Sequence, residues 1–362
     1  VKWKKDNLKF NLSVNDARVW GDEQVYTSTG VFGNSASMDL FNAWFEYSFS
    51  NNVAVRIGRQ PWSYDDHHLL SGRNWNDRGL LYDGALLKYN KGDFDLDMGV
   101  SWNSNVADFF GNNYDLTKIK TLNFLRLHQK FSDNFKGTFL SILSGKQRSA
   151  DIDKPYLKST TGAYLVYGNN PLKVNAGAYY QGGKNQGGTD KAAWMTNIKA
   201  SLMMDPFVLS AGADILSGTA AGDEKDKSFD PLYGARHKYY GTMDQYSSIP
   251  NATQGAGLHD FFATAAWKAV KKGKIGVTYH SFSTNAELTD AGGKTLEKGL
   301  GSELDFFYSQ KVHKGMAVKG GFSLLFPSET HKYLKGVQDY DKQANWFWLM
   351  VSFKPTLFTS GE

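Results

Sequence analysis

The chain has 362 residues and a formal net charge of +5, and charged residues make up 21% of it. No stretch approaches the roughly 20 consecutive apolar residues of a membrane-spanning helix, and no basic tract indicates nucleic-acid binding. Because the sequence contains no cysteine, a disulfide scaffold, a thiol nucleophile and a cysteine–zinc site are excluded.

Short polar turns recur about every forty residues, a period that suits a repeated supersecondary unit. They are rich in Asn, Asp, Gly and Pro, the residues that tight hairpin turns require. Each turn is flanked on both sides by a segment of about ten residues with an alternating pattern, which is the length of a tilted strand that crosses a membrane. The turns are Lys4–Asn7, Ser50–Asn52, Asn90–Asp93, Ser132–Asn134, Gly168–Pro171, Asp205–Pro206, Val270–Lys274 and His313–Gly315.

Apolar and polar side chains alternate within the flanking segments. The clearest case runs from Phe94 to Trp102, where Phe, Leu, Met, Val and Trp alternate with Asp, Asp, Gly and Ser. Similar alternation runs through 172–181, 194–202 and 316–324. A period of two predicts strands with two different faces, one toward lipid and one toward a polar lumen. The aromatic content of 15% suits the interfacial girdles of membrane barrels.

The pattern predicts an all-β protein: a single transmembrane up-and-down antiparallel β-barrel over residues 1–362, with sixteen complete strands. A β-propeller is the main rival, since a forty-residue period also suits one blade. Propeller blades hold four short strands, whereas each repeat here contains two long ones. The strands start near Leu8, Met38, Asn52, Gly79, Asp93, Thr121, Phe135, Leu157, Pro171, Lys191, Pro206, Gly257, Lys272, Gly299, Gly315 and Ala344.

Longer polar connections alternate with the short turns, as in outer-membrane barrels, where turns are short on the periplasmic side and loops long outside. The longest connection covers 218–256 and is predicted to be extracellular. Its aromatic and basic residues, which include Phe229, Tyr233, Tyr239 and Tyr240, predict a loop ordered against the barrel that narrows its mouth. The other connections cover 21–37, 61–78, 104–119, 146–156, 183–190, 285–298 and 327–343.

Arginines concentrate on the third strand and the loop after it. Val53, Val55 and Ile57 face lipid, so Arg56 must face the lumen, since a charge at the lipid midplane costs about 2–4 kcal/mol. Arg59 has the lipid-facing parity but lies near the outer end of the strand, where it either snorkels or turns inward at a bulge. Arg73 follows on the loop, which we expect to fold back toward the pore.

A ring of ionised guanidinium groups selects anions, so a positive zone at a constriction is predicted. The alternative is that lumenal acids pair with these cations. The charges would then keep the lumen hydrated without selecting anions. The predicted pore-lining residues are Arg18, Arg56, Arg59, Arg73, Arg78, Arg126, Lys199, Arg236, Lys238, Asp97, Glu303 and Asp305.

One local sequence is more specific than the rest. It runs Arg56-Ile-Gly-Arg59-Gln-Pro-Trp-Ser-Tyr64-Asp-Asp and continues to Tyr82-Asp-Gly84; Phe229-Asp-Pro-Leu-Tyr233 and the run around Arg18 add to it. The chain thereby resembles the alginate-export (AlgE-type) outer-membrane porin family. The resemblance implies eighteen strands in the full protein, because the family pattern begins with a further hairpin before the first strand at Leu8, a hairpin that this sequence lacks. It also implies a positively charged constriction that passes an acidic polysaccharide or small anions.

The run Asp65-Asp66-His67-His68 contains residue types that bind metals or act in catalysis. Adjacent residues of an extended chain point to opposite sides, so the four side chains cannot share one ion without a special loop shape. Pairing within the loop is therefore the preferred interpretation. No metal, cofactor or catalytic residue is predicted, and Asp223–Lys227 is interpreted as a solvated loop.

The sequence therefore predicts a channel for passive diffusion of polar or anionic solutes, acidic saccharides among them, across the bacterial outer membrane. Its predicted partners are outer-membrane lipid and a small polar or anionic solute, without nucleic acid. The alternative is a barrel plugged by its own loops that serves as a structural subunit, with protein partners in a larger envelope assembly.

Overall fold

The structure, a computed structural model, describes residues 1–16, 38–73, 79–105, 111–231, 233–270, 273–337 and 343–356. Seventeen strands form one sheet. In chain order they are β1 (Lys2–Lys5), β2 (Leu8–Asp16), β3 (Met38–Ser48), β4 (Val53–Gln60), β5 (Tyr82–Lys91), β6 (Phe94–Trp102), β7 (Thr121–Ser132), β8 (Phe135–Gly145), β9 (Lys158–Gly168), β10 (Leu172–Gly183), β11 (Ala193–Met204), β12 (Phe207–Leu216), β13 (Leu258–Val270), β14 (Gly273–Ser283), β17 (Gly299–His313), β18 (Met316–Pro327) and β19 (Ala344–Phe353).

A few short elements lie in the connections. β15 (Leu288–Thr289) and β16 (Thr295–Leu296) form a hairpin of their own, and two 3₁₀ turns, Arg236–Lys238 and Asn251–Thr253, lie within residues 218–256. The helix α1 (Glu329–Lys335) starts after Ser328, whose hydroxyl caps it by accepting the backbone N–H of His331. Within the described ranges, no helix is long and apolar enough to cross a membrane.

Each strand of the sheet pairs antiparallel with the next strand of the sheet along the chain, as in the β9–β10 and β10–β11 pairs. β14 pairs with β17 because the intervening β15 and β16 form their separate hairpin. The predicted up-and-down meander is confirmed, and one continuous sheet excludes a propeller. The sixteen predicted strands are present and start within three residues of the predicted positions, and β1 precedes them.

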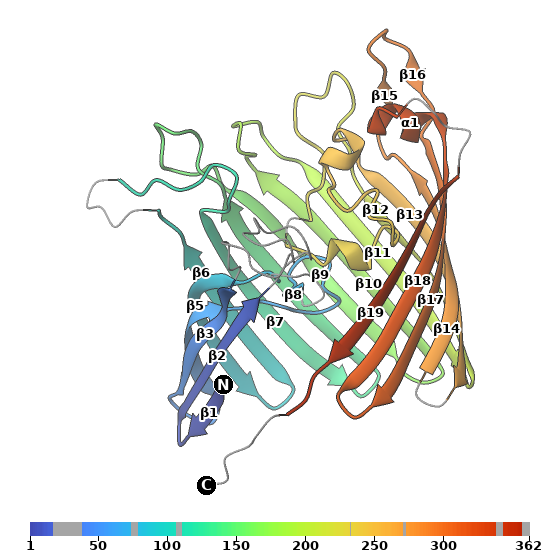
Figure 1. The fold of residues 1–362 in the computed structure, drawn as a ribbon. Helices are drawn as coiled ribbons and strands as arrows, with labels where there is room; N and C mark the ends of the chain where they lie inside the picture. The colour runs from blue at the N-terminus through green and yellow to red at the C-terminus, as the bar shows by residue number, and fades with distance from the viewer. Residues whose placement is uncertain are drawn as a thin grey trace, which may run out of the picture.

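The two ends of the sheet do not pair with each other in the part of the chain that the structure describes. β1 pairs with β2, and β19 pairs with β18. In Figure 1 the dark blue β1 and β2 and the dark red β19 stand on opposite sides of a seam in the barrel wall. The described wall is therefore one strongly curved sheet of seventeen strands.

The connections divide between the two rims of the barrel (Figure 1). The short turns, such as those between β5 and β6 and between β7 and β8, lie at the lower rim, which we call the turn rim. The longer described connections, the β15–β16 hairpin and α1 lie at the opposite, loop rim. This is the predicted asymmetry of an outer-membrane barrel.

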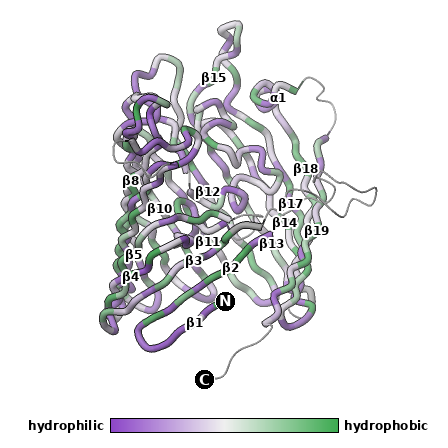
Figure 2. Tube along the Cα trace, turned by 60° about the vertical axis from the view of Figure 1, so that its left-hand side comes forward, coloured by the Kyte–Doolittle hydropathy of each residue, from purple (hydrophilic) through white to green (hydrophobic). Residues whose placement is uncertain are grey.

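The two faces of the wall differ in chemistry, and hydrophobic and hydrophilic residues alternate along the trace in Figure 2. On the outer face, the apolar side chains of Ile57 and Phe261 remain exposed, as lipid contact requires. On the inner face, the polar side chains of Glu46, Asp97 and Asn197 are buried. The strand parity read from the sequence therefore places these side chains on the expected faces.

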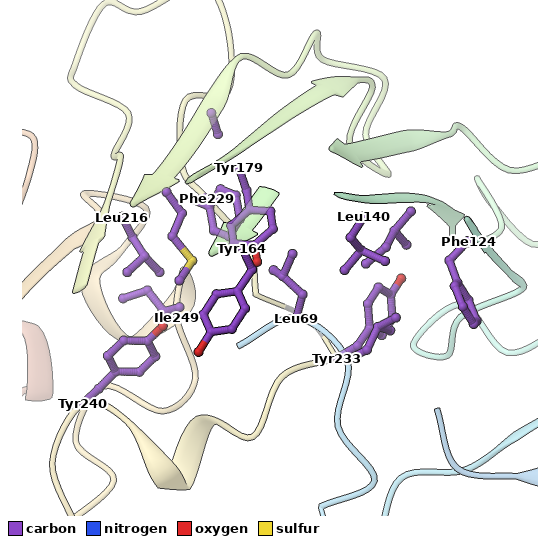
Figure 3. Close-up of a cluster of buried hydrophobic side chains, with 14 of the residues drawn as sticks. Leu69, Phe124, Leu140, Tyr164, Tyr179, Leu216, Phe229, Tyr233, Tyr240 and Ile249 are labelled. Carbon is purple, nitrogen blue, oxygen red and sulfur yellow. The ribbon is translucent and has the colours of Figure 1, made fainter. Parts of the chain in front are cut away.

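Part of the barrel interior is an apolar core, which the alternating pattern does not predict. Residues 61–73 and the 218–256 loop fold into the lumen and pack against the inner wall. Figure 3 shows Leu69 of the first segment beside Tyr233 and Ile249 of the second, with the wall residues Tyr164 and Leu216 around them. The long loop is thus ordered against the barrel, as its aromatic residues predict.

Candidate functional site

The two inward-folded segments hold each other inside the barrel. The backbone N–H of Ala235 donates to the carbonyl oxygen of His67 at 2.8 Å, and that of Ser71 donates to Tyr233 at 3.0 Å. The guanidinium of Arg73 donates from Nε to the carbonyl oxygen of Gly234 at 2.9 Å. Residues 61–73, which we call the inner loop, and the long loop of 218–256 therefore form one body that narrows the lumen.

Arg56 faces the lumen, as predicted, but it is paired. It lies directly opposite Glu46 across the β3–β4 ladder and donates to that carboxylate from Nε at 3.0 Å and from Nη2 at 2.7 Å. Lys9 and Lys88 also donate to Glu46, at 2.8 and 3.2 Å. One buried carboxylate thus organises three cations, and the group keeps a net positive charge.

Arg126 is held more tightly, between two carboxylates. Its Nη1 lies 3.3 Å from Asp97, its neighbour across the β6–β7 ladder, and its Nη2 lies 3.3 Å from Asp65 of the inner loop. The guanidinium also lies 4.9 Å from the ring centroid of Tyr64, within the range of a cation–π interaction. Arg126 therefore ties the inner loop to the wall and carries no surplus positive charge.

His68 forms a second tie between the inner loop and the wall. Its Nδ1 lies 2.7 Å from Asp66, its Nε2 lies 3.1 Å from Asp214 of β12, and its ring stacks on Tyr239 of the long loop. Burial lowers the pKa of His68, but the carboxylates of Asp214 and Asp66 outweigh burial and raise it to about 9. The imidazole is therefore protonated at neutral pH and donates from both nitrogens.

Glu303 and Asp305 of β17 face the lumen, as predicted, and bind the backbone of the long loop. The N–H of Met243 donates to Glu303 at 2.8 Å, and the N–H of Thr242 donates to Asp305 at 3.1 Å. Gly241 has a φ of +84°, and a Cβ there would lie 2.7 Å from the carboxylate of Glu303. These acids therefore anchor the loop at a place that only glycine fits.

The basic residues of the long loop are also engaged. Arg236 donates to the carbonyl oxygen of Ser247 at 3.1 Å and lies 3.4 Å from Asp230. The ammonium of Lys238 donates to the carbonyl oxygen of Asp66 at 2.8 Å. Burial lowers the pKa of Lys238 and of Arg73. Lys238 and Arg73 thus hold the two loops together inside the lumen, and Arg236 joins two parts of the long loop to each other.

Several lysines project inward near the turn rim, and five of them, on β8, β10, β11, β14 and β18, each lie within six residues of a short turn. They share the strand parity of buried inner-face residues such as Asn197 and His280, while their outward neighbours Ile198 and Ile275 are exposed apolar residues. Within the described residues, none of the five forms a salt bridge. We call this group the lysine belt: Lys136, Lys173, Lys199, Lys274 and Lys319.

Two lysines of the belt, Lys136 and Lys173, line a cavity at the turn rim. Lys199 lies within electrostatic range of Lys173 and Lys274, and its side chain is exposed. A cavity of about 400 Å³ is lined by Lys130, Lys136, Lys173 and amides of the neighbouring turns. Of this group only Lys199 is among the predicted pore-lining residues, although strand parity, the same signal, places the other four inward as well.

Arg59 does not line the lumen, which corrects its assignment as a pore residue. It shares the outward parity of Ile57, is 40% exposed, and forms a two-point ion pair with Asp83 at 2.7 and 2.9 Å. A further hydrogen bond joins Nη1 to the carbonyl oxygen of Leu40 at 3.3 Å. Arg18 and Arg78 lie outside the described residues.

The acidic and histidine run of the inner loop is used for pairing. Asp65 also accepts the hydroxyl of Thr138 at 2.9 Å, and Asp66 also accepts the amide of Asn197 at 3.1 Å. Among the residues that the structure describes, no group of three or more His, Asp and Glu side chains is arranged to hold a metal ion. In the long loop, Asp223 pairs with Lys227.

Comparison with known proteins agrees with this architecture. A family model described as alginate export matches residues 1–338. A search of curated proteins gave no match.

Solved structures with this fold include three proteins from Gram-negative bacteria. OccK10 (OpdN) of Pseudomonas aeruginosa is 12% identical, with a TM-score of 0.60 over 99% of this chain and 92% of that chain. OccAB4 of Acinetobacter baumannii is 14% identical, with a TM-score of 0.58 over 96% and 85%. OccK5 (OpdH) of P. aeruginosa is 11% identical, with a TM-score of 0.61 over 97% and 88%. At these identities the likeness shows the shared barrel fold.

Proposed function

The chain belongs to the alginate export family, and from this premise we propose that it conducts polar solutes passively and prefers anions, acidic saccharides among them. It lies in the bacterial outer membrane and has a porin-like barrel, the architecture of a channel and not of an enzyme. The choice of solute is the part that we propose, with outer-membrane lipid around the wall and a small polar or anionic solute in the lumen.

The lysine belt is the observation that supports anion preference. Its five ammonium groups face the lumen without salt bridges to the described residues, so their field acts on a passing solute. At about 4 Å and an effective dielectric constant of 20, one pair of opposite charges interacts by on the order of 4 kcal/mol. A few such encounters offset part of the cost of removing water from a carboxylate.

The predicted arginines contribute less than the belt. Arg126 lies between Asp97 and Asp65, and Arg56 shares Glu46 with Lys9 and Lys88. The group around Glu46 still carries a net positive charge, so it adds to the field of the belt near β2–β5. The function therefore rests on lysines that remain exposed and not on the arginine motif itself.

The test is the reversal potential of the purified barrel in planar bilayers under a KCl gradient. Wild-type channels should prefer chloride over potassium, and the preference should fall as salt rises, since the Debye length shrinks from about 10 Å at 0.1 M to about 3 Å at 1 M. The triple variant Lys173→Gln, Lys199→Gln, Lys274→Gln should shift the reversal potential toward potassium. A change of about 1.4 kcal/mol in barrier would alter relative permeability tenfold.

A matched control removes three lysines from the exposed loops instead. The variant Lys154→Gln, Lys225→Gln, Lys294→Gln loses the same charge at exposed loop positions and should keep the wild-type reversal potential. A wild-type channel that prefers potassium would contradict the proposal, as would a belt variant that behaves like this control.

The inward-folded loops favour a second candidate, a plugged barrel that serves as a structural subunit with protein partners in an envelope assembly. Large side chains of the long loop, including Phe229, Tyr240 and Tyr246, are fully or almost fully buried inside the barrel. Stable conductance steps in a planar bilayer would exclude this candidate. Complete absence of conductance, together with co-purification of an envelope protein, would favour it over the channel.

A further inference from the structure

A small cavity lies between the long loop and the inner wall near the loop rim. Its volume is about 170 Å³, which is below the roughly 300 Å³ of pockets for drug-sized ligands. It has room for several waters or one small solute. The residues that give it its chemistry are Lys146, Lys158, Lys184, Lys191, Tyr156 and Tyr233.

Two of these lysines are fixed by aspartates of the long loop. Lys158 lies 3.0 Å from Asp230, and Lys191 lies 3.0 Å from Asp226, with side chains that are 11% and 3% exposed. Asp230 is itself held by Gln181, whose amide donates to its carbonyl oxygen at 2.8 Å and accepts its N–H at 3.0 Å. These contacts fix the positions of Lys158 and Lys191 before any ligand binds.

The other two lysines leave a surplus of positive charge. Within the described residues, Lys146 has no salt bridge, and Lys184 pairs with Asp190 at 2.6 Å in a pair that is largely exposed. The cavity lining thus holds four ammonium groups and the two carboxylates Asp226 and Asp230. An exposed pair such as Lys184–Asp190 contributes little stability, so an incoming anion can compete with Asp190 and the carbonyl oxygen of Gly188 for the ammonium of Lys184.

The rest of the lining suits a hydroxylated molecule better than a bare ion. Tyr156 lies against the guanidinium of Arg148 at 3.9 Å and presents an aromatic surface to the cavity. The amides of Asn185 and Gln186 and the hydroxyl of Ser144 also line it. The two amide nitrogens already donate, to Asp226 and to the carbonyl oxygens of Leu116 and Gln147, so the amide oxygens are the groups that can accept from a ligand. Aromatic surface with a few polar groups is typical of sites that bind small organic ligands.

We propose that this cavity binds a small hydroxycarboxylate, with the carboxylate at Lys146 and Lys184 and the hydroxyl groups donating to the amide oxygens. The inference rests on the proposed function, because it gives an anionic solute a place to bind before it reaches the lysine belt. It adds a solute site, formed jointly by the wall and the long loop, at the end of the lumen opposite the belt.

The test is isothermal titration of the detergent-solubilised barrel with D-glycerate, with glycerol as the neutral probe of the same carbon skeleton. Glycerate should bind saturably and glycerol should not. The variant Lys146→Gln, Lys184→Gln should bind glycerate at least about tenfold more weakly, a change of about 1.4 kcal/mol. The control Lys154→Gln, Lys294→Gln should bind it like the wild type. Heat-modifiable migration on gels verifies that each variant is folded.

Two results would overturn the inference: no saturable glycerate binding by the wild type, or equal binding by the Lys146→Gln, Lys184→Gln variant. The reversal potential, measured on the same preparations, separates this site from the function of the lumen. Anion preference without glycerate binding removes the cavity site alone. Glycerate binding in a channel without anion preference removes the proposed selectivity and leaves the site.

Discussion

The lumen has two charged regions that treat their cations differently. In the region around the inner loop, Arg126 is held by Asp97 and Asp65, and His68 by Asp66 and Asp214. Near the turn rim, the five belt lysines project inward without salt bridges among the described residues. The first region uses its charges to fix loops to the wall, and the second leaves them exposed to solute.

The difference follows from burial and from side-chain chemistry. A charge that loses its water must be paired, and a guanidinium can satisfy two carboxylates at once through its planar fork. An ammonium on a long flexible stem keeps its hydration in a wet lumen and acts as a point charge. The loops fill the lumen around the inner loop and leave it open near the turn rim. Arg126 therefore fixes the inner loop to the wall, whereas the ammonium groups of the lysine belt keep no ionic partner in the described ranges.

Removal of the long loop tests this division most strongly. Deletion of 222–252 removes the buried Phe229, Tyr246 and Ile249 from the lumen, so single-channel conductance should rise several-fold. The lysine belt lies on the strands and remains, so the preference for chloride should persist. Conductance steps and reversal potentials in planar bilayers measure both quantities.

A deletion of similar location but different packing provides the control. Residues 290–293 form the exposed tip of the β15–β16 hairpin, and their removal should leave conductance unchanged. Unchanged conductance in the 222–252 variant would mean that the long loop does not limit the pore. Loss of chloride preference in that variant would mean that the loop, and not the belt, determines selectivity.

The strand arrangement could be predicted from sequence because it depends on local patterns. Turn residues and period-two alternation place the strands, and the parity of Val55 and Ile57 places Arg56 inside. The pairing of Arg56 with Glu46 also follows from short-range information, since the two residues face each other across one hairpin. The sequence predicts Arg56 inside the lumen and leaves open whether lumenal acids pair with it.

The apolar core inside the barrel could not be predicted in the same way. Asp65 meets Arg126 and His68 meets Asp214 only because the inner loop folds back across the lumen, over sequence separations of 61 and 146 residues. No periodic pattern encodes such contacts. The aromatic content of 218–256 predicts that the loop packs against the barrel, but it does not show which strands of the wall the loop contacts.

The substitution Arg126→Met should affect stability more than selectivity. It leaves Asp65 and Asp97 without their cation, and removal of one partner from a buried pair costs about 3–5 kcal/mol. The inner loop should become more sensitive to protease, and the temperature at which the barrel unfolds on gels should fall. The reversal potential should move much less than in the triple lysine variant.

Arg56→Met serves as the comparison for Arg126→Met. Glu46 retains Lys9 at 2.8 Å and Lys88 at 3.2 Å after this change, so the loss of stability should be smaller. If Arg126→Met shifted the reversal potential as far as the lysine substitutions do, the paired region would contribute directly to selectivity. This result would contradict the assignment of selectivity to the lysine belt.

His68 gives the inner loop a dependence on alkaline pH. Its pKa in the folded protein is about 9, above its unperturbed value, so the protonated imidazole stabilises the loop fully below pH 6.5. This stabilisation, about 3 kcal/mol from the size of the shift, is lost as pH rises through 9. Hydrogen-exchange protection of residues 61–73 should fall between pH 6.5 and 9.5.

The variant His68→Gln is the control for that experiment. It cannot be protonated, so the protection of the inner loop should be weaker at pH 6.5 and should no longer change with the same midpoint. Asp66, Asp214 and Tyr239 contact His68, and Lys238 donates to the carbonyl oxygen of Asp66; all four residues remain in the variant. Identical pH profiles for the two proteins would show that His68 does not hold the loop.

The smallest effect is expected at Arg59, three positions after Arg56 and therefore on the opposite face of the same strand. Its ion pair with Asp83 is 40% and 55% exposed, and exposed pairs contribute about 0–1 kcal/mol. Arg59→Gln should therefore lower stability by less than about 1 kcal/mol and leave the reversal potential unchanged, since the side chain lies outside the lumen. The reversal potential is measured in planar bilayers beside that of the triple lysine variant, and the stability is measured from the temperature at which the barrel unfolds on gels. A shift of similar size in both would place Arg59 in the conduction path and contradict the strand parity on which the inward position of the lysine belt depends.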